Sequence, residues 1–211
     1  MRRAALLAVV IALGVVVRPT WSAFSASTVN EDNAFSAAGS FCTAPGTQTL
    51  VPNADAFVRQ TSAGSNFGTA STVRVQSAVN LLLFPDNERT LVRFSLPAIP
   101  SWCTLTTATL RMNASSAAAG RTLQAIRAAA AWTETGVTWT NQPATAGAAS
   151  TAGSGTGWRE WDVRTQVEAM YAGTNAGFLV RDASEGAVLA QTQVFSSREG
   201  ANPPQLVLTF A

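Results

Sequence analysis

Short segments in which apolar and polar residues alternate, separated by turn residues, set the fold class of this 211-residue chain. In residues 107–112 and 205–210 every second residue is apolar. Residues 90–96 likewise keep Val92 and Phe94 on one side of an extended chain. Because successive side chains of a strand point to opposite faces, this period predicts half-buried strands of an antiparallel sheet. Similar patterns predict further strands at 54–59, 72–76, 122–128, 158–163, 177–182 and 192–197.

One short stretch has helical spacing instead. Asp162 can cap a helix that Gly173 ends, and the apolar residues between them fall three and four apart: Val163, Val167, Met170 and Tyr171. The stretch 144–157 contains only Ala, Thr, Gly and Ser, and we expect an exposed loop there. About nine strands, one short helix and one core predict an all-β, jelly-roll-like antiparallel β-sandwich.

Composition excludes several kinds of catalytic site. The chain has no His and 2 Cys, so it cannot carry a Ser-His-Asp triad, a Cys-His pair or a His-based zinc site. The Cys spacing does not fit a zinc ribbon or a C-x-x-C redox pair. Phosphate-binding glycine loops of the Walker or Rossmann type are also missing. Any bound metal is therefore expected to be a hard cation held by oxygen ligands.

Residues 1–25 have the parts of an export signal. Arg2 and Arg3 form a positive start, residues 4–17 are apolar without a charge, and Ala23-Phe24-Ser25 is a small-residue cleavage pattern. The apolar run is shorter than the roughly 18 residues that span a bilayer, so we predict a cleaved signal peptide rather than stable membrane insertion. A retained short anchor is the alternative. The Thr-, Pro-, Gly- and Gln-rich residues 42–52 predict an extended lead-in over 26–53, which leaves 54–211 for the sandwich.

Loss of this leader changes the charge balance. The whole chain has 14 Arg, no Lys and 12 acidic residues, a formal charge of +2. Without residues 1–25 it keeps 11 Arg and 12 acidic residues, which makes the charge −1. A nucleic-acid partner therefore has no support from composition.

Export also decides how the two cysteines are interpreted. In an oxidising compartment Cys42 and Cys103 are expected to form a disulfide. Closing a loop of about 60 residues stabilises the fold by roughly 4 kcal/mol in the chain-entropy model. Two buried free thiols are the alternative.

A series of short motifs stands in order along the predicted sandwich: ADAFVR (54–59), NFG (66–68), NERTLVRF (87–94), ATLR (108–111), WTE (132–134), VTWTNQP (137–143), GWREWDV (157–163) and FSSRE (195–199). In this order they resemble the DNRLRE-domain family, which is grouped among carbohydrate-binding modules as family 96. The resemblance implies an extracellular, non-catalytic β-sandwich, and some members bind polysaccharides, including acidic ones. Separately, residues 24–39 resemble the segment after the signal in camelysin-type Gram-positive surface proteins.

Sugar binding in such modules relies on exposed aromatic faces. Trp158 shares its strand parity with acidic residues and is the candidate platform. Trp161 has the opposite parity and is expected to be buried. Trp132 and Trp139 are spaced like packing residues of a core, and Trp102 is expected to pack against the disulfide.

Arginine side chains on outward-facing strand positions are candidate ligand-binding residues as well: Arg59, Arg74, Arg93 and Arg111. A guanidinium can hold the carboxylate of a uronic acid through two parallel hydrogen bonds. If their strands are neighbours, these residues form a basic stripe. The alternative is a solvated sheet face on which they pair with scattered acids.

Two carboxylates lie two residues apart on one predicted strand, Glu160 and Asp162, hence roughly 6–7 Å apart on one face. This spacing suggests either a pair of catalytic carboxylates or part of a structural calcium site. Asp55 and Glu199 are further loose candidates for calcium ligands. No cofactor is expected besides such an ion.

Together these observations predict a secreted, non-catalytic, monomeric carbohydrate-binding module. It would recognise a cell-wall or extracellular polysaccharide, with acidic ones included, by aromatic stacking and by Arg and polar contacts. Two alternatives of other classes stay open. One is a structural cell-surface or matrix protein without glycan binding, and the other is a polysaccharide lyase or hydrolase that uses Glu160 or Asp162.

Overall fold

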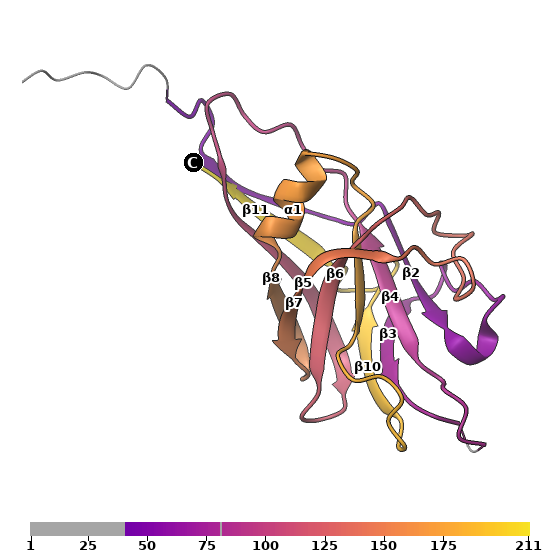
Figure 1. Ribbon diagram of the computed structural model, residues 1–211. Coiled ribbons are helices and arrows are strands. Elements are labelled where there is room, and N and C mark those ends of the chain that lie inside the picture. The colour runs from indigo at the N-terminus through magenta and orange to yellow at the C-terminus, as the bar shows by residue number, and fades with distance from the viewer. Residues whose placement is uncertain (1–40, 81) are drawn as a thin grey trace, which may run out of the picture. The chain divides into compact units, whose positions relative to one another are not determined.

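A continuous antiparallel sheet curls over an apolar interior in the computed structural model of the chain, which describes residues 41–80 and 82–211 (Figure 1). Its eleven strands are β1 (Gly46–Leu50), β2 (Ala54–Arg59), β3 (Thr72–Ser77), β4 (Glu88–Arg93), β5 (Leu105–Ala117), β6 (Thr122–Ala128), β7 (Thr145–Gly153), β8 (Gly157–Asp162), β9 (Phe178–Asp182), β10 (Gln191–Ser196) and β11 (Gln205–Phe210). In the described ranges there is one α-helix, α1 (Arg164–Tyr171), and one 3₁₀ turn, Gln60–Ser62. The all-β, sandwich-like prediction is confirmed.

The strand order explains how the sheet closes on itself. Its path is β1-β11-β5-β10-β3-β4-β9-β6-β7, while β2 pairs with β4 and β8 pairs with β5. The curl brings β7, at one end of this path, back beside β8. There the Ser150 hydroxyl donates a hydrogen bond to the Asp162 carbonyl oxygen. We call this junction the β7–β8 seam.

The main core lies between the facing layers and follows the predicted alternation. Leu110 of β5, Leu208 of β11 and Phe195 of β10 are fully buried. Val167 and Met170 of α1 join the same cluster, so the helix covers part of the apolar interior. Removal of this apolar surface from water is the dominant driving force for such a fold.

A smaller second core lies on the other face of β2, β4 and β9. Leu91 and Leu179 are buried there beneath residues 129–143, which we call the covering segment. Trp132 of this segment is 6% exposed and donates a hydrogen bond from Nε1 to the Ala176 carbonyl oxygen at 2.8 Å. Trp139 is half-buried against the same cluster. The expectation that Trp132 and Trp139 pack in a core is confirmed.

Two strands lie where no alternation predicts them. β1 falls within the expected lead-in and pairs with β11 from Gly46–Phe210 to Leu50–Leu206. β7 occupies 145–153, so the expected exposed loop is a strand there, and most of its residues are exposed as expected. Neither strand has the buried apolar residues that make a strand recognisable in sequence. The predicted signal peptide and residues 26–40 of the lead-in lie outside the described residues.

The disulfide forms as predicted between Cys42 and Cys103. It ties the chain before β1 to the turn before β5, where the Thr43 N–H also donates to the Ser101 carbonyl oxygen at 3.0 Å. Trp102 is 70% exposed, with a left-handed φ of 62°, rather than buried against the disulfide. Within the two described ranges no helix has the length and apolar character to span a membrane.

Removal of the disulfide by the double substitution C42S/C103S should lower the free energy of unfolding by about 2–4 kcal/mol, because the unfolded chain regains the freedom of the open loop. Urea unfolding followed by tryptophan fluorescence measures this change. The parent protein in reductant is the matched control and should show the same loss. An unchanged midpoint in both would show that this loop closure does not stabilise the fold.

Candidate functional site

The candidate platform Trp158 lies on β8 and is half-buried at the edge of a shallow hollow. The hollow has a volume of about 340 Å³ and is lined by Ala152, Gly153, Trp158, Arg159 and Glu160. In the pairing of β8 with β5, Glu160 stands opposite Arg111. The Arg111 guanidinium lies 4.7 Å from the centre of the Trp158 ring and donates from Nε to Glu160 Oε1 at 2.7 Å. Indole, guanidinium and carboxylate are therefore held together on one face.

The four candidate arginines do not form one stripe. Arg59 and Arg93 stand at opposite ends of the β2–β4 pair, and Arg111 is on β5. Arg59 makes two hydrogen bonds to Asp86, at 2.9 and 2.6 Å. Arg93 donates to the Trp132 carbonyl oxygen at 3.0 Å. Arg74 is exposed and lies 5.6 Å from the centre of the Phe57 ring. Three of the four thus have polar partners inside the protein.

The candidate calcium ligands are divided between two places. Glu160 is paired with Arg111 on β8. Asp162, at the end of the same strand, accepts the N–H of Arg164 at 3.1 Å. The N-cap of α1 is Val163, which makes no side-chain capping hydrogen bond, so the prediction that Asp162 caps the helix is wrong by one residue. Asp55 and Glu199 lie in a different cluster. Nowhere in residues 41–80 and 82–211 do three or more His, Cys, Asp or Glu side chains come together as a metal site requires.

The cluster around Asp55 joins four segments that are distant in sequence. The Asp55 N–H donates to Glu134 Oε1 at 2.9 Å, and Asp55 Oδ2 accepts the Arg198 N–H at 2.7 Å. Arg198 Nη1 also donates to both Glu134 oxygens, at 3.0 and 2.7 Å. Asn66 Nδ2 donates to the carbonyl oxygens of Glu134 and Val137, both at 2.7 Å. The sequence analysis assigned no individual role to Glu134, Asn66 or Arg198. The only sequence feature that could have pointed to them is that they belong to the ordered motifs.

Burial raises the pKa of Asp55 from 3.8 to about 7. The hydrogen bond from the Arg198 backbone N–H lowers this pKa, and the nearby charges of Glu199 and Glu134 raise it further. Asp55 Oδ1 is buried and has no hydrogen-bond partner in the structure. A proton on this carboxyl therefore favours the folded state.

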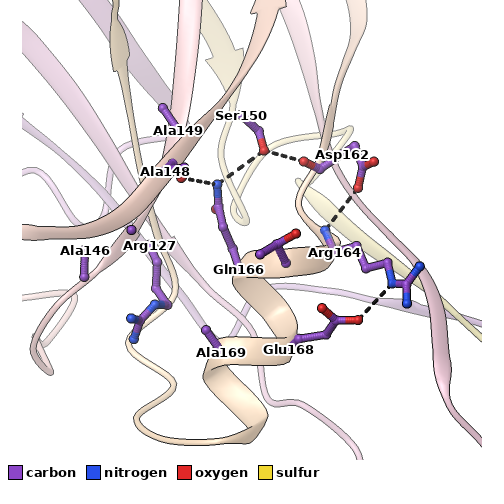
Figure 2. Close-up of a pocket in the computed structure, with 12 residues that line it drawn as sticks. Arg127, Ala146, Ala148, Ala149, Ser150, Asp162, Arg164, Gln166, Glu168 and Ala169 are labelled. Carbon is purple, nitrogen blue, oxygen red and sulfur yellow. Dashed lines mark hydrogen bonds and ion pairs between the residues drawn. The ribbon is translucent and has the colours of Figure 1, made fainter.

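A second, larger hollow lies further along the β7–β8 seam, against α1 (Figure 2). We call it the α1 cleft. It has a volume of about 550 Å³ and is lined by residues 146–150 of β7, by Asp162, by residues of α1 and by Arg127. Gln166 of α1 is only 7% exposed and donates from Nε2 to the Ala148 carbonyl oxygen at 3.0 Å and to Ser150 Oγ at 3.3 Å. Sequence reasoning missed this cleft because it expected a loop at 144–157.

A family model described as carbohydrate-binding module family 96 matches residues 46–210, which run from the first residue of β1 to the last of β11. The chain belongs to carbohydrate-binding module family 96. A search of curated proteins gave no match. The carbohydrate-binding part of the resemblance is thus confirmed, and family 96 is defined by carbohydrate binding rather than by catalysis.

Within this module most residues of the ordered motifs stabilise the fold. Trp132, Glu134 and Asn66 hold the covering segment in place, and Arg198 connects it to the loop between β10 and β11. Trp161, from GWREWDV, is fully buried as predicted. In the same motif, Trp158 and Glu160 face the hollow.

Asp55 should make the stability of the module depend on pH. Because its pKa is higher in the folded state, at about 7 against 3.8, its stabilising protonation is complete below pH 3.8 and is lost as the pH rises to about 7. Asp55→Asn keeps an oxygen for the Arg198 N–H but cannot ionise. Relative to the parent, the variant should therefore gain about 1.4 kcal/mol for each pH unit between about 5 and 7.

Urea unfolding of both proteins at about pH 5, 6, 7 and 8 measures this difference. Parallel curves of stability against pH for parent and variant would contradict it. Comparison of the two proteins separates Asp55 from Glu88, whose pKa is raised as well because it is buried.

Proposed function

We propose that this family 96 module is secreted and holds an extracellular polysaccharide at the hollow beside Trp158 without converting it. The family supports a carbohydrate partner. The observation that carries the proposal is the half-buried indole, set at the wall of an open hollow together with Arg111 and Glu160. An aromatic face beside planar polar groups suits a sugar ring, which is apolar on its C–H faces and polar at its rim.

The small residues of β7 favour access to this hollow. Ala152 and Gly153 leave space next to the indole that larger side chains would fill. Arg111 lies over the ring and is fixed by Glu160 and by Gln205 Oε1 at 3.2 Å. The Arg111 and Trp158 side chains therefore need little reordering on binding, which limits the entropic cost of association. The ion pair also reduces the local positive charge, so binding at Trp158 does not require an acidic sugar.

The environment of Glu160 argues against a glycosidase or lyase. A general acid needs a carboxyl that keeps its proton near neutral pH, usually by burial. The Glu160 side chain is 54% exposed and is ion-paired with Arg111, so it lacks the burial that such a carboxyl has. The disulfide is in keeping with secretion, since such bonds persist in oxidising compartments.

Substitution W158A should weaken retention on the bound polysaccharide by about tenfold, which corresponds to the loss of about 1.4 kcal/mol of stacking. Affinity electrophoresis in gels containing β-glucan, xylan, mannan or polygalacturonate measures the retention. W102A is the matched control, because Trp102 is an exposed indole just before the start of β5, whereas Trp158 pairs with Asn113 near the other end of that strand. No retention of the parent on any of these polymers would refute the function, and loss with W102A alone would move the site to the disulfide turn.

A further inference from the structure

The α1 cleft has no part in binding at Trp158. Its volume of about 550 Å³ exceeds the 340 Å³ or so of the hollow beside Trp158, and it lies on the same seam. We propose that the α1 cleft is a second carbohydrate site, which takes an uncharged sugar unit of the same glycan chain that stacks on Trp158. This inference rests on the proposed function and extends it to a named second site.

One wall of the cleft contains a β-bulge. Ala125 pairs with Ser150 and Arg127 pairs with Ala146, so the three residues 147–149 of β7 stand opposite the single residue Ile126. Bulges of this kind redirect the backbone and are common beside binding sites. The buried Gln166 amide bonds the bulge at Ala148 and also reaches the Ala125 carbonyl oxygen at 3.0 Å. The cleft is therefore held in shape by the fold without a ligand.

The charged groups around the cleft balance one another. Arg164 pairs with Glu168 at 2.9 Å, and Asp162 also lines the cleft. The Arg127 side chain makes no hydrogen bond or ion pair with any residue that the structure describes. Figure 2 shows this side chain on the side of Ala146, away from Glu168. Two guanidiniums and two carboxylates give no net charge. A polyanion therefore gains little here, whereas sugar hydroxyls, which both donate and accept, match such a mixture of donors and acceptors.

The remaining lining leaves room for a ring. Small residues form one wall: Ala146, Gly147, Ala148, Ala149 and Ala169. The volume of about 550 Å³ lies within the range of small-molecule sites, about 300–1,000 Å³. The lining contains no aromatic residue, so recognition here relies on hydrogen bonds and contacts with methyl groups rather than on stacking.

The two hollows lie in line along the seam. Trp158 and Asp162 are four residues apart on β8, which corresponds to about 13 Å along the strand. Ala152 and Gly153 border the first hollow, and residues 146–150 border the second. An extended glycan chain that enters both would bind its second unit at a high effective concentration. Long oligosaccharides should therefore bind more tightly than short ones.

The experiment compares A169L, which fills the α1 cleft, with A172L, a matched Ala-to-Leu change at an exposed position just after the helix and outside the cleft. Leu is a good helix former, so both variants should fold, as circular dichroism will verify. The probes are short and long neutral oligosaccharides of cellulose, xylan and mannan, with oligogalacturonate as the charged comparison. Isothermal titration calorimetry in low and high salt gives the affinities.

We expect A169L to lower the affinity for long neutral oligosaccharides by about tenfold or more, so that long and short oligosaccharides bind equally well. A172L should bind like the parent. Salt should leave these affinities nearly unchanged, because the ligand is uncharged. If A169L binds like the parent while W158A does not, the second site is wrong and the proposed function stands. If A169L loses binding while W158A keeps it, the cleft is supported and the Trp158 site fails. Binding to oligogalacturonate alone, with a steep salt dependence, would overturn the assignment of an uncharged sugar.

Discussion

Leu91 and Leu179 lie on the face of β4 and β9 that points away from the main interior, and the covering segment keeps water from them. A sheet that is apolar on both faces cannot remain open on one side, so the fold depends on this segment staying in place. Apolar contact through Trp132 and Val137 supplies most of the attraction. The hydrogen bonds of Glu134 with Arg198 and with the Asp55 N–H fix its position. This arrangement buries the Asp55 carboxyl, which disfavours its charged form and raises its pKa.

The opposite side of the sandwich has no such cover. On β8, β5 and β11 the outward residues are polar or half-exposed, among them Trp158, Arg111 and Gln205. Their partners are one another, as in the Arg111 bonds to Glu160 and Gln205. This asymmetry favours the uncovered side for the proposed ligand binding. There side chains can exchange water for sugar hydroxyls without opening a core.

Sequence periodicity predicted the strands whose alternate residues are buried, because only burial imposes a period on residue types. The limits 122–128 and 205–210 agree with β6 and β11. The limits 54–59 agree with β2, although this strand is buried on both faces. β1 and β7 hold their places through backbone hydrogen bonds at the ends of the sheet, and small polar residues suffice for that. The disulfide followed from cysteine number and export. Strand alternation correctly distinguished buried Trp161 from half-buried Trp158. Residues in a turn do not alternate, so the prediction for Trp102, which is exposed, was wrong.

Candidate ionic sites were harder to predict, because strand parity gives the face of a residue but not its neighbours. Arg59, Arg93 and Arg111 do face away from the main core, yet each meets a partner supplied by a segment distant in sequence. The α1 cleft was invisible for the same reason, since it arises where a bulge, a helix and a strand end converge. Its wall comes from β7, which contributes little to either core. Substitutions in β7 can therefore reshape the cleft at small cost in stability. The residues that secure the covering segment lack this freedom, and so the shape of the proposed binding surface can vary separately from the fold that supports it.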